Sequence, residues 1–427
     1  MDNLPSYPCG SSEHGLTRRQ MLGTLGGAVG FGSLLQPAIA EQIKQKQKQV
    51  CLIWLDGGMS QYESWHPLPD SRFGGPFRSI KTSIPGVHFS ELVPNTAKIA
   101  HKISVIRSMA TKDPNHSTGV ARIQRGDPLN RGVDYPYLGS AIAKLIGPAN
   151  PDLPPYIWIK PGNGGFIHRE AGFLGSKYGA LALGDGKPPV HIHRPDSISA
   201  EIDEARNALR KKANERFKSY RHASEIDAYE TSYDLARQLM ARKEIFDDSR
   251  LGPKDRERYG THPLGRHILQ ARELLDAGVR FVKVNSYHWD THSDNFNMSQ
   301  RLIPQMDQPF AALINDLDER GALDHTLVVV MSEFGRTPVI NSRIGRDHWP
   351  DCWSIALAGC GIKRGAIIGE TTPDGSFVKG EGYDIGHLFH TIFKLLEIDT
   401  KKTRYRHKGQ KLAIANDDCK PIREVML

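Results

Sequence analysis

Short apolar runs along the chain predict the strands of a buried sheet. Nearly every residue in these runs is apolar, which is typical of strands covered on both faces, as in a parallel α/β sheet. The predicted strands are residues 50–55 (VCLIWL), 103–107, 156–160, 279–284 (VRFVKV), 326–331 (TLVVVM) and 354–358.

Segments with a helical period lie between several of these strands. They predict helices at residues 134–149, 301–320 and 383–396, and a longer helical block at 197–277. Within that block, apolar residues recur at helical spacing, first Ile202, Ala205, Leu209, Ala213 and Phe217, then Tyr233, Ala236, Leu239 and Met240. The many charges of the block are interpreted as solvated faces. We interpret the block as a helical insertion or cap in a main domain of the α/β class.

The first 40 residues are predicted to be an export signal that is not part of the fold. Residues 17–22 (TRRQML) resemble the twin-arginine signature, an apolar run follows at 21–35, and Ala38-Ile39-Ala40 forms a cleavage site. We therefore expect export by the Tat machinery, a mature chain that starts at Glu41, and a periplasmic or secreted location. The alternatives are an amphipathic helix or a membrane anchor. Because the run is short and contains several glycines, we expect no stable membrane insertion.

Composition and charge narrow the function classes. The chain has 427 residues, 39% hydrophobic and 24% charged, and a net charge of +8. This basic excess fits an anionic substrate or surface. Nucleic acid is not expected, because no Lys/Arg block is interleaved with aromatic residues. Of the five cysteines, Cys9 lies in the leader, and the other four are either buried thiols or one or two disulfides.

Polar side chains follow four of the predicted strands, at the point where each strand ends. They are Asp56 before two glycines, the loop 111–119 (TKDPNHSTG), Asp290 with His292, and Glu333 with His348 farther on. The carboxyl ends of parallel strands lie at one edge of a sheet, where open α/β sheets bind ligands. The sequence therefore predicts that these four groups converge.

Each motif alone also has a purely structural explanation. Asp56-Gly57-Gly58 is a common turn sequence, Ser117 or Thr118 caps a helix, and residues 326–350 form a strand followed by a charged loop. Convergence from distant parts of the chain favours the functional interpretation.

The predicted cluster has the chemistry of a metal site. Carboxylate oxygen together with imidazole nitrogen suits Zn²⁺ or Mn²⁺, with Ca²⁺ or Mg²⁺ as alternatives. Arg336 and Arg346 follow the 326–331 strand, and we predict that they bind the oxygens of a phosphate or sulfate group.

Six motifs together resemble a known family. They are the twin-arginine leader, LDGG at 55–58, NH at 115–116, WDTH at 289–292, SEFGRTP at 332–338 and GRDHWP at 345–350. Their order resembles the alkaline phosphatase and sulfatase superfamily, and within it the Tat-exported domain-of-unknown-function family 1501. The resemblance implies an alkaline-phosphatase-like, three-layer α/β/α sandwich over residues 41–427, with a mostly parallel sheet and the helical insertion at about 197–277. It implies no particular substrate.

The resemblance also implies roles for single residues. The implied metal ligands are Asp56, Asp290, His292, Glu333 and His348. Two positions depart from the superfamily pattern, because Asp294 stands where a histidine is due and Phe334 stands where the next histidine ligand belongs.

The nucleophile is implied to lie in the loop 111–119. Thr111 and Ser117 are the candidates, and the neighbouring pair Asn115-His116 resembles the nucleotide pyrophosphatase branch, in which an Asn holds the substrate oxyanion. No Cys-x-Pro-x-Arg signature is present, so a formylglycine sulfatase is not expected.

Two main functions remain open from the sequence, beside a third in which the protein takes part in surface assembly and needs only the fold. The first is an exported, metal-dependent hydrolase of phosphate or sulfate esters that acts on an anionic small molecule or glycan ester. The alternative is a non-catalytic member of the same fold that binds an anionic glycan or another envelope component, which the replacement of a ligand by Phe334 favours.

Overall fold

The architecture comes from a computed structural model, which describes residues 47–126, 132–188, 194–220, 224–246 and 251–427. The predicted export signal lies outside the described residues. Among the residues that are described, no helix is both long and apolar enough to cross a membrane.

The strands are β1 (Gln49–Leu55), β2 (Ser79–Lys81), β3 (His88–Ser90), β4 (Ser104–Met109), β5 (Tyr156–Lys160), β6 (Gly165–Ile167), β7 (Ala180–Gly184), β8 (Phe281–Ser286), β9 (Thr326–Met331), β10 (Gly335–Arg336), β11 (His348–Trp349), β12 (Trp353–Ala358), β13 (Ile367–Ile368), β14 (Arg404–His407) and β15 (Gln410–Ala413).

The longer helices lie on both faces of the main sheet or in the helical block. They are α3 (Pro94–Lys98), α4 (His116–Arg125), α5 (Leu138–Leu145), α6 (Ala200–Tyr220), α7 (Ser224–Ala241), α8 (Pro253–Tyr259), α9 (Pro263–Asp276), α10 (Asn295–Glu319) and α11 (Ile385–Leu395).

A nine-stranded sheet forms the centre of the protein, in the order β13-β4-β12-β9-β1-β8-β5-β7-β6. The five strands from β9 to β7 are parallel neighbours. Strand β12 is antiparallel to both β9 and β4, and β6 is antiparallel to β7. Because β12 reverses the direction and β4 reverses it again, β1, β4, β8 and β9 all point the same way. The predicted mostly parallel sheet is confirmed.

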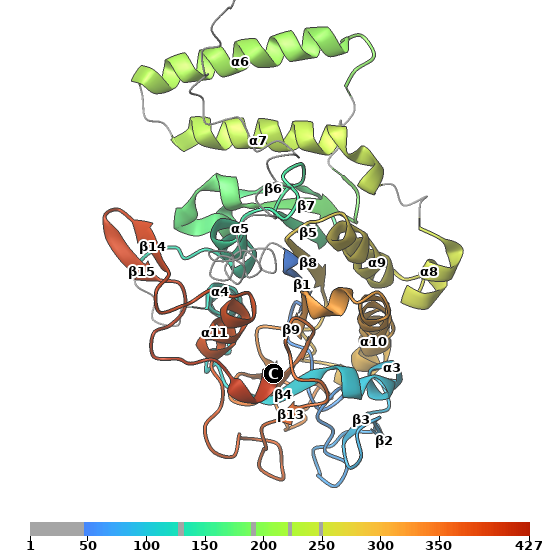
Figure 1. Cartoon of the computed structure of the whole chain (residues 1–427). Helices are drawn as coiled ribbons and strands as arrows, with labels where there is room; N and C mark the ends of the chain where they lie inside the picture. Colours follow the sequence, from blue (N-terminus) through green and yellow to red (C-terminus); the bar gives the residue numbers. More distant parts are fainter. Residues whose placement is uncertain (1–46, 127–131, 189–193, 221–223, 247–250) are drawn as a thin grey trace, which may run out of the picture. The chain divides into compact units, whose positions relative to one another are not determined.

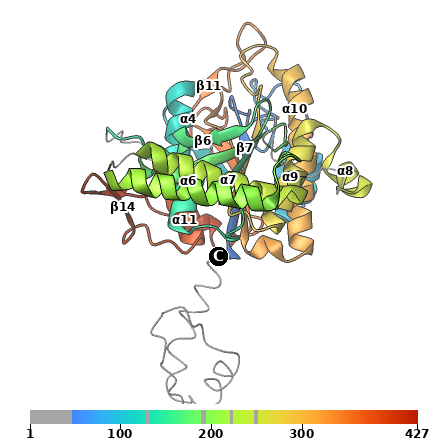
Figure 2. The same ribbon diagram turned by 90° about the horizontal axis from the view of Figure 1, so that it is seen from above.

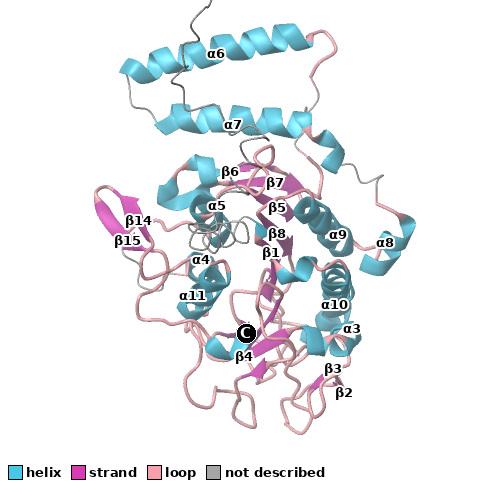
Figure 3. Ribbon diagram, in the orientation of Figure 1, coloured by secondary structure: helices cyan, strands magenta, loops and turns pink. Residues whose placement is uncertain are grey.

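Two apolar cores lie on opposite faces of the sheet. The side chains of β1 alternate between them, with Cys51, Ile53 and Leu55 in one core and Val50, Leu52 and Trp54 in the other. Helices α3, α9 and α10 cover the first face, and α4, α5 and α11 cover the second, as Figures 1 and 3 show. The result is the predicted three-layer α/β/α arrangement.

The helical block at 197–277 contains two different kinds of helix. Helices α6 and α7 form a hairpin, with the two helices next to each other in Figure 1 and overlapping in the view of Figure 2. Helix α9 instead buries most of its residues, among them Leu264, Ile268 and Leu275, in the first core. It therefore belongs to the layer that covers the sheet, because its apolar stripe is wide enough to pack on β8 and α10.

Short strands without a long apolar run are absent from the predicted set. Strand β7 is one of them, because its residues Ala-Leu-Ala-Leu-Gly alternate small and large side chains. The four cysteines among the described residues, Cys51, Cys352, Cys360 and Cys419, are free thiols, and all four are buried.

Candidate metal centre

The four predicted strand ends meet at one edge of the sheet. The backbone N–H of Asp56, after β1, donates to the carbonyl of Ser286 at the end of β8, over 2.8 Å. The backbone N–H of Gly57 donates to Oε1 of Glu333, which follows β9, over 2.9 Å. The loop after β4 joins them, because Nδ1 of His116 lies 2.8 Å from the same Glu333 oxygen.

Glycine is required after Asp56 because the chain passes very close to its neighbours. Gly57 has φ +118°, and a Cβ atom there would lie 2.5 Å from the backbone nitrogen of Asp290. Gly58 has φ +92°, and a Cβ atom there would lie 2.8 Å from the ring of Phe334. The two glycines thus let β1 and its loop approach Asp290 and Glu333 closely enough to form one site.

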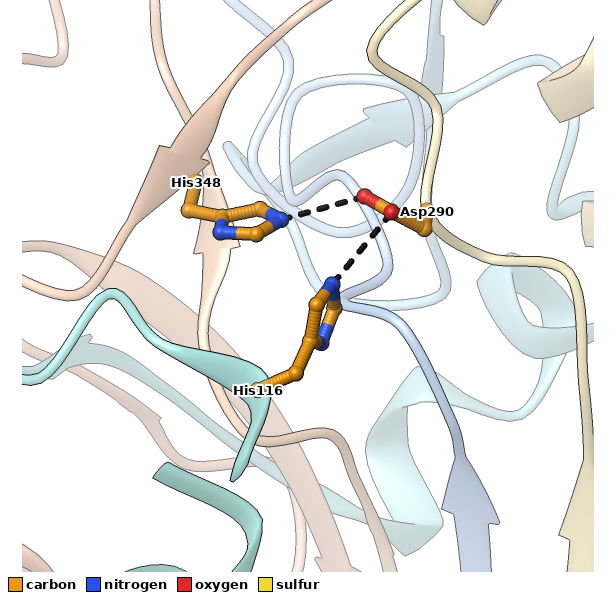
Figure 4. Close-up of side chains that lie close together, drawn as sticks. All are labelled: His116, Asp290 and His348. Carbon is orange, nitrogen blue, oxygen red and sulfur yellow. Dashed lines mark hydrogen bonds and ion pairs between the residues drawn. The ribbon is translucent and has the colours of Figure 1, made fainter. Parts of the chain in front are cut away.

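Three imidazole rings converge on the Asp290 carboxylate. Nε2 of His348 lies 3.1 Å and Nε2 of His292 lies 3.3 Å from Oδ1 of Asp290. Nε2 of His116 lies 3.3 Å from Oδ2. Figure 4 shows His116 and His348 pointing toward Asp290 from two different segments. Ligand atoms of His116, Asp290 and His348 all lie within 4.8 Å of one another.

Each ring is fixed from behind through its other nitrogen. Nδ1 of His116 faces the Glu333 carboxylate, Nδ1 of His292 lies 2.6 Å from Oδ1 of Asp347, and Nδ1 of His348 lies 2.6 Å from the carbonyl oxygen of Pro114. All three partners accept hydrogen bonds, so the proton of each neutral ring is held at Nδ1. The three Nε2 lone pairs are therefore directed inward.

Local structure explains these positions. His116 is the first residue of α4, whose N-cap Asn115 accepts a hydrogen bond from the backbone N–H of Ser117. His348 lies on β11, which pairs with Arg336 on β10. The predicted role of Asn115 in holding an oxyanion stays a prediction, since its side-chain oxygen caps the helix in this structure.

Charge is distributed unevenly over the cluster. The hydrogen bond to Glu333 raises the pKa of His116 above its usual value, against the effect of partial burial. Burial would raise the pKa of Asp290, but the neighbouring His348 ring and the Arg336 guanidinium outweigh it and hold that pKa below its usual range. Burial raises the pKa of Asp56, and the Glu333 carboxylate raises it further.

A buried carboxylate oxygen points to a missing positive charge. The Glu333 side chain is 0% exposed, and its Oε2 atom is buried without a hydrogen-bond partner among the described residues. In addition, Nε2 of His292 and Nε2 of His348 lie only 2.9 Å apart. Two lone pairs at this distance repel each other unless a proton or a cation lies between them. Three nitrogen donors and one carboxylate form a ligand set that fits Zn²⁺ or Mn²⁺.

The two arginines predicted to bind the substrate are buried. The Arg336 side chain is 0% exposed, donates to Oδ1 of Asp290 over 2.7 Å, and uses its other N–H groups on backbone carbonyls. Arg346 is also 0% exposed and pairs with Glu63 over 2.8 Å. Both guanidiniums hold loops together in this structure, and their predicted contact with an anion stays a prediction.

The candidate nucleophiles lie in different surroundings. Thr111 is fully buried, and its hydroxyl has no hydrogen-bond partner among the described residues. Ser117 is exposed, next to His116 in the first turn of α4. Within the described structure, neither hydroxyl forms a hydrogen bond with the imidazole cluster.

Sequence reasoning missed three supports of the cluster. Asp347 directly precedes His348 in GRDHWP, and this adjacent carboxylate was a usable signal. The contact with the carbonyl of Pro114 could not be predicted from the sequence, because every residue has a backbone carbonyl. The Phe334 ring is 0% exposed and lies 4.2 Å from the ring of His348 and 5.1 Å from that of His116, centre to centre. Phe334 therefore forms a wall of the cluster where a further ligand was expected.

Solved structures with a similar arrangement are sulfatases and members of the alkaline phosphatase superfamily. The PsFucS1 sulfatase from Pseudoalteromonas sp. is 12% identical, with 88% of this chain and 74% of that chain covered and a TM-score of 0.38. A TAB5 alkaline phosphatase variant with Mg bound is 14% identical, with 82% and 98% covered and a TM-score of 0.38. A protein of the alkaline phosphatase superfamily from Vibrio parahaemolyticus is 12% identical, with 83% and 67% covered and a TM-score of 0.36.

Comparison with curated protein sequences gives no match. A family model described as "Protein of unknown function (DUF1501)" matches residues 47–426. This match covers almost all of the chain after the first 46 residues, as the motifs LDGG, WDTH, SEFGRTP and GRDHWP suggested. The chain belongs to the DUF1501 family.

Proposed function

We propose that the protein is a hydrolase of phosphate or sulfate esters that depends on a divalent metal ion. One observation carries this proposal: three imidazoles, each fixed through Nδ1, direct Nε2 toward a single carboxylate. Metal-binding histidines usually have this arrangement, with the second nitrogen held by a carboxylate or a carbonyl. A purely structural cluster would not need three lone pairs that face one another.

His116, Asp290 and His348 would hold the ion, with His292 beside them. When bound, the ion would supply Lewis-acid chemistry, polarising an ester oxygen and neutralising negative charge. Glu333 and Asp347 orient two of the imidazoles through Nδ1.

The surroundings suit an anionic ester. The side chains of His116 and Asp290 are 37% and 42% exposed, so the cluster is open to a substrate. His116 also begins α4, where free backbone N–H groups favour negative charge. Ser117, exposed in the same turn, is the more accessible of the two predicted nucleophiles, because Thr111 is buried. The predicted substrates are anionic small molecules or glycan esters.

Metal content and activity test the proposal together. The purified protein should contain about one Zn²⁺ or Mn²⁺ per chain by elemental analysis, and should cleave at least one member of a panel of phosphomonoesters, phosphodiesters and sulfate esters. Asp290→Ala should remove both the metal and the activity, while Asp374→Ala, which changes an exposed turn carboxylate, should leave both unchanged. Protein that contains no metal and has no activity on any ester contradicts the proposal.

The second candidate function is anionic glycan binding without catalysis. Phe334 in a ligand position and the buried hydroxyl of Thr111 favour it. Glycan binding that survives both EDTA and Asp290→Ala would support this function, and loss of binding on chelation would exclude it.

We further propose Tat export to the periplasm or beyond, on the basis of the leader motif. Replacing Arg18 and Arg19 together with lysine should retain the protein in the cytoplasm on cell fractionation. Unchanged export of that variant would contradict the proposal.

A further inference from the structure

Helix α6 packs on α7 through its polar side. Nη2 of Arg210 lies 3.4 Å from Oδ1 of Asp234, and Nζ of Lys218 lies 2.7 Å from Oδ1 of Asp227. Asn207 is the buried residue of α6. Positions 207, 210, 214 and 218 follow one another at steps of three or four, so they lie on one face of the helix. The polar face of α6 is thus used for the contact with α7.

The apolar side of α6 faces outward. Ile202 is 51%, Leu209 72% and Tyr220 80% exposed. These three residues are separated by seven and eleven positions, close to whole numbers of turns, so they point in one direction. Figure 1 shows α6 on the side of α7 that is away from the sheet. Scattered apolar residues are normal on a surface, but a continuous stripe on one helix face marks an interaction site.

Positive charge borders this stripe. Lys211, Lys212 and Arg216 are exposed, and in the part of the chain that the structure describes none of them forms an ion pair. Glu215 is the one acidic residue between Leu209 and Tyr220. A shallow hollow of about 510 Å³ is lined by apolar and basic residues together, namely Leu209, Lys212, Ala213, Arg216, Phe217 and Tyr220.

We propose that the outer face of α6 binds the surface of an anionic lipid bilayer. An interfacial helix inserts a stripe of leucine and aromatic side chains among the headgroups, while flanking lysines and arginines contact acidic lipids. Leu209 and Tyr220 provide the stripe, and Lys211, Lys212 and Arg216 provide the charge. The binding is peripheral, since α6 is not apolar enough to cross the membrane.

A second copy of the chain fits this face less well. Packing two α6 stripes against each other would bring the cations at 211, 212 and 216 of both copies to the rims of one interface. Glu215 is the one acidic residue among these cations, and the other acidic residues of α6 lie near its start, at 201, 203 and 204. Like charges at such positions are destabilising. An anionic bilayer complements the same charges, and for this reason the proposal commits to lipid.

The test is sedimentation of the purified full-length protein with vesicles. We expect binding to phosphatidylcholine vesicles that contain one third phosphatidylglycerol, weaker binding to pure phosphatidylcholine, and a decrease as salt rises. Leu209→Gln should weaken vesicle binding about tenfold, because it removes an apolar side chain from the stripe. The double variant Lys212→Gln with Arg216→Gln should weaken it about thirtyfold, because each charge near an anionic surface contributes roughly 1 kcal/mol.

Matched controls carry the same chemical changes on other exposed elements. Leu427, 92% exposed, is replaced as Leu427→Gln, and Arg406 and Lys408 of the β14–β15 hairpin are both replaced with glutamine. These controls should bind like the parent. Equal binding to neutral and anionic vesicles, or equal losses in the control variants, overturns the proposal. A concentration-dependent dimer that Leu209→Gln abolishes, without vesicle binding by the parent, would assign the face to a second copy and would also overturn it.

Discussion

Replacing Glu333 with glutamine tests whether the three imidazoles form a metal centre. The Glu333 side chain is fully buried, and its Oε1 accepts from the backbone N–H of Gly57 at 2.9 Å and from Nδ1 of His116 at 2.8 Å. Glutamine has the same shape and keeps an oxygen acceptor for both donors. The substitution therefore removes the negative charge behind His116 and changes little else.

The expected magnitude follows from the position of this charge. A carboxylate that accepts from a metal-binding imidazole makes the ring a stronger ligand, and losing such a partner typically lowers metal affinity 10- to 100-fold. This corresponds to about 1.4 to 2.8 kcal/mol. In the metal-free protein, Glu333→Gln has two opposite effects on stability. It weakens two hydrogen bonds that the charged carboxylate accepts, which destabilises the fold. It also removes a buried negative charge that repels Asp56, which stabilises the fold. We therefore expect the free energy of unfolding of the metal-free protein to change by less than about 1 kcal/mol.

Two measurements are needed, with Glu63→Gln as the control. Calorimetric titration of the metal-stripped protein with Zn²⁺ or Mn²⁺ gives the affinity, and urea unfolding in EDTA gives the stability. Glu63 is also 0% exposed, but its carboxylate pairs with the buried guanidinium of Arg346, not with the imidazoles. Glu63→Gln should cost about 3–5 kcal/mol of stability, because it leaves that guanidinium buried without a countercharge, and should leave metal affinity unchanged.

The two variants should therefore show opposite patterns. If Glu333→Gln binds the ion as tightly as the parent, the carboxylate does not support a metal ligand. If Glu333→Gln instead loses stability as Glu63→Gln does, with no change in affinity, the cluster is a structural network. Either result refutes the role of Glu333 behind a metal ligand, and a parent protein that binds neither ion in the same titration refutes the assignment of a metal centre to this edge of the sheet.

Three further predictions test the site and its surroundings. Adding Zn²⁺ at about 100 times its dissociation constant should stabilise the parent by about 2.7 kcal/mol in thermal unfolding, EDTA should reverse this, and His348→Gln should show neither effect. Gly57→Ala should lower the free energy of unfolding in urea by about 3 kcal/mol, because the added Cβ atom would lie 2.5 Å from the backbone nitrogen of Asp290. The control Gly162→Ala, at φ +79° with open space around it, should lower it by about 1 kcal/mol from backbone strain alone. Burial lowers the pKa of His66 to about 3, so this ring stays neutral in the folded protein, whereas the unfolded chain takes up a proton below pH 6.5. The free energy of unfolding should therefore fall by up to about 1.4 kcal/mol per pH unit from pH 6.5 toward pH 3. Between pH 7 and pH 5, urea unfolding should show that His66→Gln loses about 2 kcal/mol less of this free energy than the parent.

The sheet was predictable because its strands are apolar throughout. Six runs anticipated β1, β4, β5, β8, β9 and β12, and the parallel direction of β1, β4, β8 and β9 brought their polar ends together as expected. Burial on both faces leaves a strong signal in a sequence. Strand β7, with small residues at alternate positions, leaves a weak one and was missed.

The orientation of side chains at the site was less predictable. The sequence placed Arg336 and Arg346 beside the predicted metal ligands. The residue type alone does not tell whether an arginine binds a substrate or holds loops together. Only the structure shows that both guanidiniums point inward to carbonyls and carboxylates. In α6, similarly, the helical spacing of Leu209 and Ala213 was read correctly, but spacing alone does not tell which face meets α7.

Phe334 would limit the proposed metal centre to one ion. Its ring fills the space beside His116 and His348, where the resemblance to the superfamily places another ligand. Two carboxylates close to the cluster are partly engaged, because Oε1 of Glu333 accepts from Gly57 and His116 while Oδ2 of Asp56 lies 3.3 Å from Nε1 of Trp54. A second ion would therefore lack a nitrogen ligand and would compete with the contacts that orient His116. In the proposed metal centre, Glu333 would thus act behind a ligand and Phe334 would close one side, so that the cluster would hold a single cation.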